Sequence, residues 1–400
     1  MAEPKLSSSQ ELVNKYMMNF INRIPLTFVK GKGMRLWDEN GKEYLDFVGG
    51  WAANSLGHCP PVLTKALRDQ SRTLIHCSNA YYNVPLGKLA ELLCKNSCFD
   101  RVFFANSGAE ANEGVVKLAK RWGALKLNGA YEMITTYQSF HGRTLAMVAA
   151  TGQAKMQKPY VPLTPGFVNV EYNNIEAIKN ATTDKTCAVM IEPIQGEGGV
   201  NIPSVEYLKQ LRHFCDEKGL MLIYDEVQTG MGRLGTLFGY QVFGVEPDVI
   251  TLAKGIASGL PIGAILAKEK SAVFAPGDHG STFGGNPLST AAGYAVTRYI
   301  IEKDIPGNAA RMGKYLMTRL NEMKAKHSSI NDVRGIGLLI AIEFKEDIAG
   351  DVMKACLERG FMINLIKPNT LRVIPPLIIK RVEVEEGLGV LEEVLTEMGK

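Results

Sequence analysis

Between residues 101 and 254, short runs of apolar residues alternate with longer segments that have helical spacing. The apolar runs are residues 101–105, 132–136, 187–192 and 221–226, and the helical segments include residues 109–121 and 204–218. Apolar runs without polar alternation are typical of strands that are buried on both faces of a parallel sheet. Such strands need right-handed helical crossovers, and the ligands of these sheets bind at the carboxyl ends of the strands. The sequence therefore predicts an α/β fold with a site at that edge.

Two chemically complementary residues lie in strand-like runs. The run at residues 221–226 ends on Asp225 and Glu226, and the run at residues 251–256 contains Lys254. An amine at the end of a strand can bond to the aldehyde of pyridoxal phosphate, and an acid can keep the pyridine nitrogen of that cofactor protonated. On these two residues alone, a salt bridge between strand ends is the open alternative.

The composition is that of an ordinary globular protein. The chain has 400 residues, of which 46% are hydrophobic and 22% are charged, which suits two or three domains with a substantial core. The net charge of +4 is small, and no basic block predicts nucleic-acid binding. Residues 1–5 lack a basic leader before an apolar stretch, and no run approaches the ~18 apolar residues of a membrane span. We therefore expect a cytoplasmic protein without a membrane segment.

The seven cysteines are odd in number and scattered through the chain, which suits reduced thiols in a reducing compartment. Cys94 and Cys98 are four residues apart on an expected helix, but no second pair of cysteines or histidines completes a metal site. We therefore expect buried thiols and no metal.

The N-terminal region contains a hairpin signal and a glycine-rich loop. Within residues 30–47, Asn40 and Gly41 separate two alternating runs, and both residues tolerate the positive φ of a tight hairpin turn. We expect this hairpin to lie outside the main sheet. Residues 49–58 are too rich in glycine and small residues for an ordinary helix. Trp51 in this loop is either a core anchor or the wall of a pocket.

Residues 106–108 connect the strand at 101–105 to the helix that follows. A loop of small residues that opens a helix exposes free backbone N–H groups at the positive end of the helix dipole, so it can hold a phosphate group. A serine or asparagine cap without a ligand is the simpler alternative.

Two further loops contain candidate site residues. Residues 139–144 include Phe140, which can stack on a flat ring, and Arg143, which can bind a carboxylate through two hydrogen bonds. An ordinary loop is the alternative for these two residues. Residues 193–199 contain glycines, which allow the backbone to come close to whatever Glu197 faces.

Residues 230–235 match the dinucleotide-binding pattern G-x-G-x-x-G. Their context differs from that of a nicotinamide site, because the glycines do not directly follow the strand and residues 236–240 do not continue as an amphipathic helix. The chain also lacks the G-x-x-x-x-G-K-[ST] pattern of nucleotide hydrolases. We therefore expect neither kind of nucleotide site.

The pattern changes after about residue 301. Expected helices at residues 308–326, 351–359 and 382–398 alternate with short strands at 336–344 and 371–374, as in a separate α+β domain. We accordingly divide the chain into an N-terminal segment with the hairpin (1–55), a large cofactor-binding domain (56–300) and a small C-terminal α+β domain (301–400). Arg372 is either buried with an anionic partner or exposed on an edge strand.

Together these motifs resemble those of the class III pyridoxal-phosphate-dependent aminotransferases, most closely the acetylornithine aminotransferases. The resemblance extends from residues 44–47 to Arg372 and depends on several separated motifs in the order that the family has. It implies the aspartate-aminotransferase-like fold (fold type I), in which helices flank a mainly parallel sheet and a smaller α+β domain follows. It also implies a homodimer whose active sites lie at the subunit interface.

The resemblance implies a role for each matching residue. Lys254 is expected to bond to the cofactor and to move protons, with Asp225 beside the pyridine nitrogen. The other expected cofactor contacts are Val227 and Phe140 on the two ring faces, Gln228 at the phenolic oxygen, Ser107, Gly108 and Ala109 at the phosphate, and Thr282 at the phosphate of the neighbouring subunit's cofactor. The expected substrate contacts are Ser281, Arg143 for the distal carboxylate, and Arg372 for the α-carboxylate of glutamate, with Glu197 masking Arg372 when the other substrate is bound. Because a free lysine is a poor base at neutral pH, the site must lower the pKa of Lys254 through burial and nearby positive charge.

The reaction that the resemblance implies moves the terminal amino group of N-acetylornithine to 2-oxoglutarate in arginine biosynthesis. Trp51 occupies the position at which ornithine aminotransferases of this family have a tyrosine, and Tyr82 is expected in the same pocket. Indole has one hydrogen-bond donor and no acceptor, so Trp51 cannot accept a hydrogen bond from a free α-ammonium, which favours an acylated amine. The alternatives are another ω-aminotransferase, acting on ornithine, succinylornithine or 4-aminobutyrate, and a catalytically silent binding protein with the same fold.

Overall fold

The computed structural model describes residues 7–399, so the N-terminal stretch of residues 1–5 considered above lies outside it. The largest sheet has the strand order β4 (Arg101–Ala105), β10 (Gly263–Ala267), β9 (Val249–Leu252), β8 (Met221–Asp225), β7 (Thr186–Ile191), β5 (Glu132–Thr136) and β6 (Phe167–Val170). Strands β9, β8, β7, β5 and β6 are parallel, whereas β10 is antiparallel to both of its neighbours. This sheet confirms the predicted α/β fold with a mainly parallel sheet.

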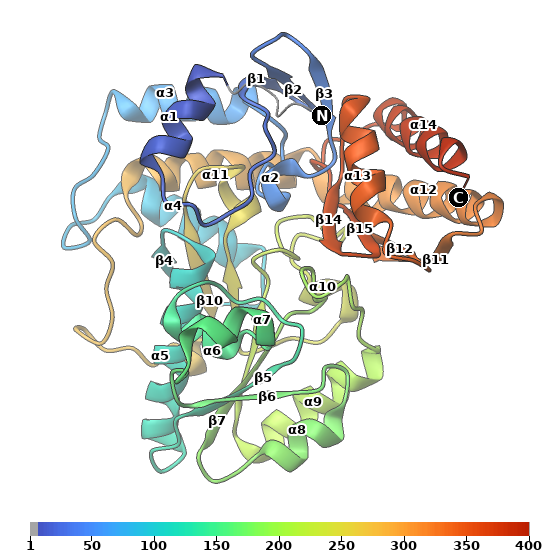
Figure 1. The fold of residues 1–400 in the computed structure, drawn as a ribbon. Helices are drawn as coiled ribbons and strands as arrows, with labels where there is room; N and C mark the ends of the chain where they lie inside the picture. The colour runs from blue at the N-terminus through green and yellow to red at the C-terminus, as the bar shows by residue number, and fades with distance from the viewer. Residues whose placement is uncertain (1–6, 400) are drawn as a thin grey trace.

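The sheet separates two hydrophobic cores. Successive side chains of a strand point to opposite faces, and in β8 Leu222 and Tyr224 contribute to one core while Met221 and Ile223 contribute to the other. The first core includes residues of α4 (Val84–Lys95), α8 (Ile175–Ala181), α9 (Val205–Lys218) and α11 (Pro287–Glu302), and the second includes residues of α5 (Gly108–Lys126) and α6 (Leu145–Ala150). Helices therefore cover both faces of the sheet, as its continuously apolar strands require (Figure 1).

The N-terminal hairpin belongs to a separate sheet, as predicted. Strands β1 (Phe28–Lys32), β2 (Arg35–Asp38) and β3 (Glu43–Asp46) are antiparallel, and β13 (Phe361–Met362) pairs in parallel with β3. The sequence did not predict this last pairing, because its two strands are far apart in the chain. It joins the N-terminal hairpin to the C-terminal region.

A third sheet lies in the C-terminal region, in the order β11 (Ile330–Ile336), β12 (Leu339–Phe344), β15 (Thr370–Val373) and β14 (Asn364–Lys367). All of its neighbouring strands are antiparallel. It accompanies helices α12 (Ile305–Lys326), α13 (Ala349–Glu358) and α14 (Arg381–Glu397), coloured orange to red in Figure 1. The strand expected at residues 336–344 begins only at Leu339, and the sequence did not predict β11 before it. The division of the chain at residues 55 and 300 stays a prediction.

The remaining helices are α1 (Ser8–Tyr16), α2 (Gly49–Ala52), α3 (Pro61–Ser71), α7 (Ala154–Gln157) and α10 (Tyr240–Phe243), with 3-10 turns at Lys158–Tyr160, Lys254–Ala257 and Glu269–Ser271. Within residues 7–399, no helix is long and apolar enough to cross a membrane. All seven cysteines are free thiols. We expected Cys94 and Cys98 to lie on one helix, but Cys98 lies beyond the end of α4.

Candidate active site

A cavity of about 400 Å³ lies beside the carboxyl ends of β8 and β9. Many residues that the sequence singled out line it together: Ser107, Gly108, Ala109, Phe140, Arg143, Glu197, Asp225, Val227, Gln228 and Lys254. They come from segments that are far apart in the chain, and strand ends of a parallel sheet bring such segments to one edge. The salt-bridge alternative for Asp225 and Lys254 is wrong, because Asp225 pairs with a histidine instead.

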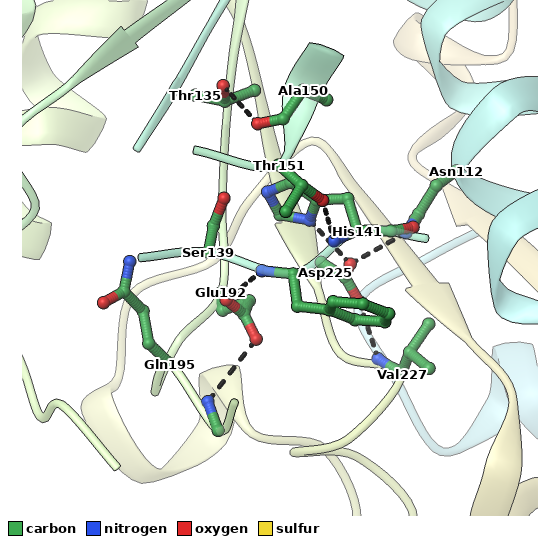
Figure 2. A network of polar contacts seen from close by, with 12 residues as sticks. Asn112, Thr135, Ser139, His141, Ala150, Thr151, Glu192, Gln195, Asp225 and Val227 are labelled. Carbon is green, nitrogen blue, oxygen red and sulfur yellow. Dashed lines mark hydrogen bonds and ion pairs between the residues drawn. The ribbon is translucent and has the colours of Figure 1, made fainter. Parts of the chain in front are cut away.

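Asp225 is the last residue of β8, and three groups hold its carboxylate. Oδ2 accepts hydrogen bonds from Nδ2 of Asn112 and from Nδ1 of His141, both at 2.8 Å, and Oδ1 accepts one from the backbone N–H of Val227 at 3.0 Å. Figure 2 shows the two side chains converging on the carboxylate from different segments. Because Asp225 is almost completely buried, these contacts fix its orientation in the cavity wall.

Lys254 lies just beyond β9, which ends at Leu252, and not within a strand as we expected. It begins a 3-10 turn with φ of 45°, a value that is uncommon for a residue other than glycine and is typical of strained functional sites. Within the described chain, its Nζ makes no hydrogen bond or ion pair. Burial lowers the pKa of Lys254 and Arg372 lowers it further, while the carboxylates of Glu197 and Asp225 act in the opposite direction.

The N-terminus of α5 also opens on the cavity. Ser107 is its N-cap residue, and the Ser107 hydroxyl accepts a hydrogen bond from the backbone N–H of Glu110 at 3.1 Å. The N–H groups of Gly108 and Ala109 belong to the first turn, where a helix offers no internal acceptor. A Cβ atom added to Gly108 would lie 2.9 Å from Cγ1 of Val227, so glycine keeps the gap between α5 and Val227 open.

Phe140 and Val227 line the cavity from different loops, and Arg143 lies near Phe140. The guanidinium carbon of Arg143 is 5.5 Å from the centre of the Phe140 ring, within the range of a cation–π interaction. The backbone N–H of Phe140 donates to Oε2 of Glu192 at 3.1 Å. These contacts fix an aromatic face and a cationic group in the same wall.

Arg372 is completely buried on β15, an interior strand of its sheet, so the exposed-edge alternative is wrong. Its NH1 group lies 2.8 Å from Oε1 of Glu197 and donates to Oε1 of Gln228 at 3.0 Å. Gln228 donates in turn to Glu197 at 3.2 Å, and Asn364 accepts from Nε and NH2 of Arg372. Burial raises the pKa of Glu197, but Arg372 and Lys254 outweigh this effect, so the net shift is downward.

Four residues that the resemblance singled out do not line the cavity. Trp51 is 55% exposed, which rules out the core-anchor alternative, and the side chain of Tyr82 is completely exposed. Thr282 is exposed as well, and Ser281 accepts a hydrogen bond from Nδ2 of Asn106 at 3.2 Å. The single chain therefore does not bring these four residues into the site.

Sequence reasoning missed several polar residues of the site. Asn112 and His141 lie in the segments 109–121 and 139–144, where the sequence pattern assigned them no role, and Glu192 is the last residue of the predicted strand 187–192. Burial and the nearby Asp225 carboxylate raise the pKa of Glu192 well above its ordinary value, although backbone N–H groups of Phe140 and Gly196 oppose the shift. A polar residue at the end of an otherwise apolar strand run was the signal that could have identified Glu192.

The sequence predicted that the glycines at residues 230–235 do not open a long helix, and the structure confirms this prediction. Added Cβ atoms would lie 3.0 Å from Leu377 at Gly232 and 2.9 Å from Ala310 at Gly235. Arg233 between them donates to the backbone oxygens of Leu338 and Pro375. This loop therefore packs closely against the C-terminal region.

The residues of the cavity fit pyridoxal phosphate. The free N–H groups at the start of a 19-residue helix suit a phosphate, and the gap beside Gly108 admits it. The buried carboxylate of Asp225 suits a protonated ring nitrogen, and Oδ1 of Asn112 in the cavity wall is a buried acceptor that has no partner among residues 7–399. Lys254 supplies an amine whose lowered pKa favours the neutral form.

Comparisons with known proteins agree with this fit. The profile of the aminotransferase class-III family matches residues 16–395. A protein of Caldanaerobacter subterraneus subsp. tengcongensis named acetylornithine aminotransferase is 49% identical over 385 residues, which cover 96% of this chain and 98% of that relative.

Two solved structures are also similar. That of the ornithine aminotransferase from Toxoplasma gondii has a TM-score of 0.93 and 32% identity, and the match covers 97% of this chain and 94% of that one. That of the acetylornithine aminotransferase from Elizabethkingia anophelis has a TM-score of 0.86 and 31% identity, with 97% and 98% covered. With the family profile matching nearly the whole length, the chain belongs to the class III aminotransferases, which use pyridoxal phosphate as cofactor.

Proposed function

We propose that this enzyme transfers the terminal amino group of N-acetylornithine to 2-oxoglutarate, giving N-acetylglutamate semialdehyde and glutamate in arginine biosynthesis. The observation that carries this substrate choice is the name of its relatives. Full-length relatives at 45–49% identity are named acetylornithine aminotransferases, and among the similar solved structures both an acetylornithine aminotransferase and ornithine aminotransferases are 31–32% identical. Trp51 would favour the same choice once the proposed dimer brings it to the substrate, because its indole offers no acceptor to a free α-ammonium.

The candidate residues in the cavity have distinct roles in this reaction. Ser107 and the N–H groups of Gly108 and Ala109 hold the cofactor's phosphate, and Asp225 holds the proton of the ring nitrogen. Phe140 and Val227 would enclose the ring, and Gln228 would contact its phenolic oxygen. Arg143 binds the distal carboxylate of either substrate, and Arg372 binds the α-carboxylate of glutamate.

The cofactor supplies an aldehyde that bonds reversibly to amines and a protonated ring that accepts electrons from the substrate carbon. Lys254 would be the amine that bonds to the cofactor's aldehyde, and its neutral Nζ would take the proton from the substrate carbon that bears the amine. A lowered pKa makes the neutral amine more abundant at neutral pH. His141 and Asn112 keep the Asp225 carboxylate oriented throughout.

The two substrates require different states of Arg372. N-acetylornithine presents no second carboxylate near the reacting amine, so Glu197 stays paired with Arg372 at 2.8 Å. Glutamate places its α-carboxylate there and displaces Glu197. Because Arg372 is completely buried, an unpaired state would be costly, and one of the two carboxylates always covers it.

We also propose that the enzyme is a homodimer in which Thr282 contacts the cofactor phosphate of the neighbouring subunit. The exposure of Thr282, Tyr82 and Trp51 in the single chain supports this assembly. So does the apolar N-terminal surface, whose exposed side chains include Tyr16, Met18 and Phe20.

The decisive experiment is the half-reaction. Purified, cofactor-loaded protein is mixed with N-acetylornithine, ornithine or 4-aminobutyrate, and the loss of the visible band of the lysine-bound cofactor is followed. Fast loss with N-acetylornithine alone is the expected result, and it also supports the role of Trp51. Fast loss with ornithine or 4-aminobutyrate instead would overturn the substrate choice, and a protein without turnover would be the silent binding protein.

The variant Arg372→Met tests the division of roles between the two arginines. We expect it to slow the half-reaction with glutamate about 100-fold, because a charged hydrogen-bonded contact of ~3 kcal/mol is lost. The half-reaction with N-acetylornithine should change much less. Arg143→Met is the matched comparison, since it should slow both half-reactions. Equal losses in both half-reactions of Arg372→Met would contradict the assignment.

A further inference from the structure

Arg334 and Arg372 lie in one row across the C-terminal sheet. Arg334 on β11 is opposite Ala341 on β12, Ala341 is opposite Arg372 on β15, and Arg372 is opposite Asn364 on β14. Residues directly opposite one another in antiparallel strands point to the same face of the sheet. Both arginines therefore face the same neighbour, which is the loop of residues 195–201.

The loop at 195–201 is closed at its base and strained near its end. Gln195 and Asn201 exchange two backbone hydrogen bonds of 3.1 Å. Val200 has φ of 54° although it is β-branched and completely buried, and Gly199 before it has φ of 125°. A β-branched residue with positive φ is a genuine outlier that persists only when surrounding contacts hold it. This loop contains Glu197, the partner of Arg372.

The guanidinium of Arg334 supplies such contacts. Nε donates to the backbone oxygens of Gly199 at 3.1 Å and Val200 at 3.2 Å, and NH2 donates to that of Gly199 at 2.6 Å. NH1 is held from the other side by Asp332 at 3.0 Å and Glu343 at 2.8 Å. Asp332 and Glu343 therefore orient the planar guanidinium of Arg334 so that its N–H groups face the strained end of the loop.

We propose that Arg334 is a positioning residue that sets how firmly Glu197 covers Arg372. It acts by holding the backbone at Gly199 and Val200, two to three residues beyond Glu197, from the same row of the sheet that presents Arg372. This inference rests on the proposed role of Arg372 as the site of a substrate carboxylate. It adds a residue that contacts neither substrate nor cofactor yet biases the enzyme between its two substrates.

The expected effect follows from competition. Glu197 and a substrate carboxylate compete for the same buried guanidinium, so the apparent affinity of a dicarboxylate depends on the fraction of molecules in which Glu197 has moved away. Without the bonds from Arg334, the loop gains conformations in which Glu197 is displaced. Loss of Arg334 should therefore strengthen the binding of a dicarboxylate rather than weaken it.

The test is the binding of glutarate, an unreactive dicarboxylate, to the cofactor-loaded enzyme by calorimetry. Four proteins form a double-mutant cycle: the native enzyme, Arg334→Met, Glu197→Gln and the double variant. We expect Arg334→Met to bind glutarate roughly 3–10-fold more tightly than the native enzyme. In the Glu197→Gln background, where the competing charge is already removed, the same substitution should change affinity less than about twofold. Arg334→Lys, which keeps one compact donor, should be intermediate.

Arg212→Met is the control for a general loss of stability. Arg212 is similarly half-buried and also holds two acids, Asp216 and Asp248, but Asp248 immediately precedes β9, at the end away from Lys254. The Arg212→Met variant should have a lower thermal midpoint of unfolding than the native enzyme but the same affinity for glutarate. Unchanged or weaker binding in Arg334→Met, or equal changes in both backgrounds, would overturn the proposal for Arg334. A native enzyme that does not bind glutarate would refute the role of Arg372 first, and the proposal for Arg334 would fall with it.

Discussion

At the scale of single residues, contacts from distant segments orient the acids of the candidate site: Asn112 and His141 donate to Asp225, and the backbone N–H of Phe140 donates to Glu192. Asp225 and Lys254 were identifiable because each follows an apolar strand run and because their chemistry is complementary. His141, Asn112 and Glu192 were not, because their partners are set by packing between α5, the loop after β5 and the end of β7. Long-range polar contacts of this kind leave no local pattern in the sequence.

Asn112 offers a test of how much orientation matters. The variant Asn112→Ala removes one of the two side-chain donors to Oδ2 of Asp225 and leaves His141 in place. We expect roughly tenfold weaker cofactor binding and a roughly tenfold slower half-reaction, because a hydrogen bond to a charged group contributes about 1.5–3 kcal/mol. Fluorescence titration and stopped-flow absorbance measure the two effects. Asn321→Ala, which removes an exposed asparagine of α12, is the control. Identical behaviour of the two variants would show that Asn112 does not orient Asp225.

Glu226 allows a prediction about pH. Burial raises the pKa of Glu226 to about 7, although the backbone N–H groups of Gly239 and Tyr240 donate to it. The folded protein therefore holds this proton more tightly than the unfolded chain, whose glutamate pKa is about 4.3. Stability should fall as the pH rises from about 4.5 to 7, by on the order of 3 kcal/mol from this group.

The variant Glu226→Gln tests whether Glu226 causes this loss of stability with rising pH. Glutamine does not titrate, so the thermal midpoint of the variant should fall less between pH 5 and pH 8 than that of the native protein. Glu322→Gln, at an exposed carboxylate on α12, should keep the native pH dependence. A Glu226→Gln protein with the native pH dependence would mean that Glu226 titrates outside this range.

At the scale of elements, the least predictable one is α2. The sequence excluded an ordinary helix at residues 49–58, but the four residues Gly49–Ala52 form a left-handed turn, with φ values between 54° and 65°. Only glycine adopts this conformation readily, so Trp51 and Ala52 are strained. Asp46 holds the start of the turn by accepting from the N–H groups of Val48 and Gly49. The composition of this segment therefore predicts that no ordinary helix forms, but the conformation that forms instead depends on tertiary contacts.

Two Gly→Ala variants separate the effect of this turn from that of helix propensity. Gly49→Ala should destabilise the protein by about 1–2 kcal/mol, because alanine is strained at φ of 54° and its Cβ would lie 3.2 Å from the carbonyl oxygen of Ile374. Gly389→Ala should stabilise it by about 0.5–1 kcal/mol, because Gly389 lies within α14 and no atom of the described residues comes within 4 Å of the added Cβ. Denaturant unfolding measures both. A shift of the same sign in both variants would contradict the assignment of the turn.

At the scale of the whole molecule, individual strands were more predictable from the sequence than the contacts that join distant segments of the chain. The apolar runs predicted as strands match β4, β5, β7 and β8 closely, since burial on both faces leaves a continuous apolar signature, whereas β6 and β10 were not predicted. The parallel pairing of β3 with β13 and the placement of Arg334 beside the loop of Glu197 join distant segments and have no such signature. The candidate site depends on such long-range contacts, because Glu197 lies in the loop after β7 of the large sheet, whereas its partner Arg372 lies on β15 of the C-terminal sheet.

The N-terminal apolar surface provides the test of the proposed assembly. Tyr16, Met18 and Phe20 are 72%, 86% and 74% exposed, and a cluster of large apolar side chains in water indicates a surface that a partner covers. We expect the native enzyme to sediment as a dimer and the variant with both Met18→Glu and Phe20→Glu to dissociate at micromolar concentration, because burying two charges at an interface is costly. Val382→Glu adds a charge at an exposed apolar residue of α14 and should leave the dimer intact. If dissociation of the double variant also weakens cofactor retention, this supports the proposed contact of Thr282 with the neighbouring site. A double variant that stays dimeric would place the interface on another surface. A native enzyme that sediments as a monomer would contradict the proposed dimer.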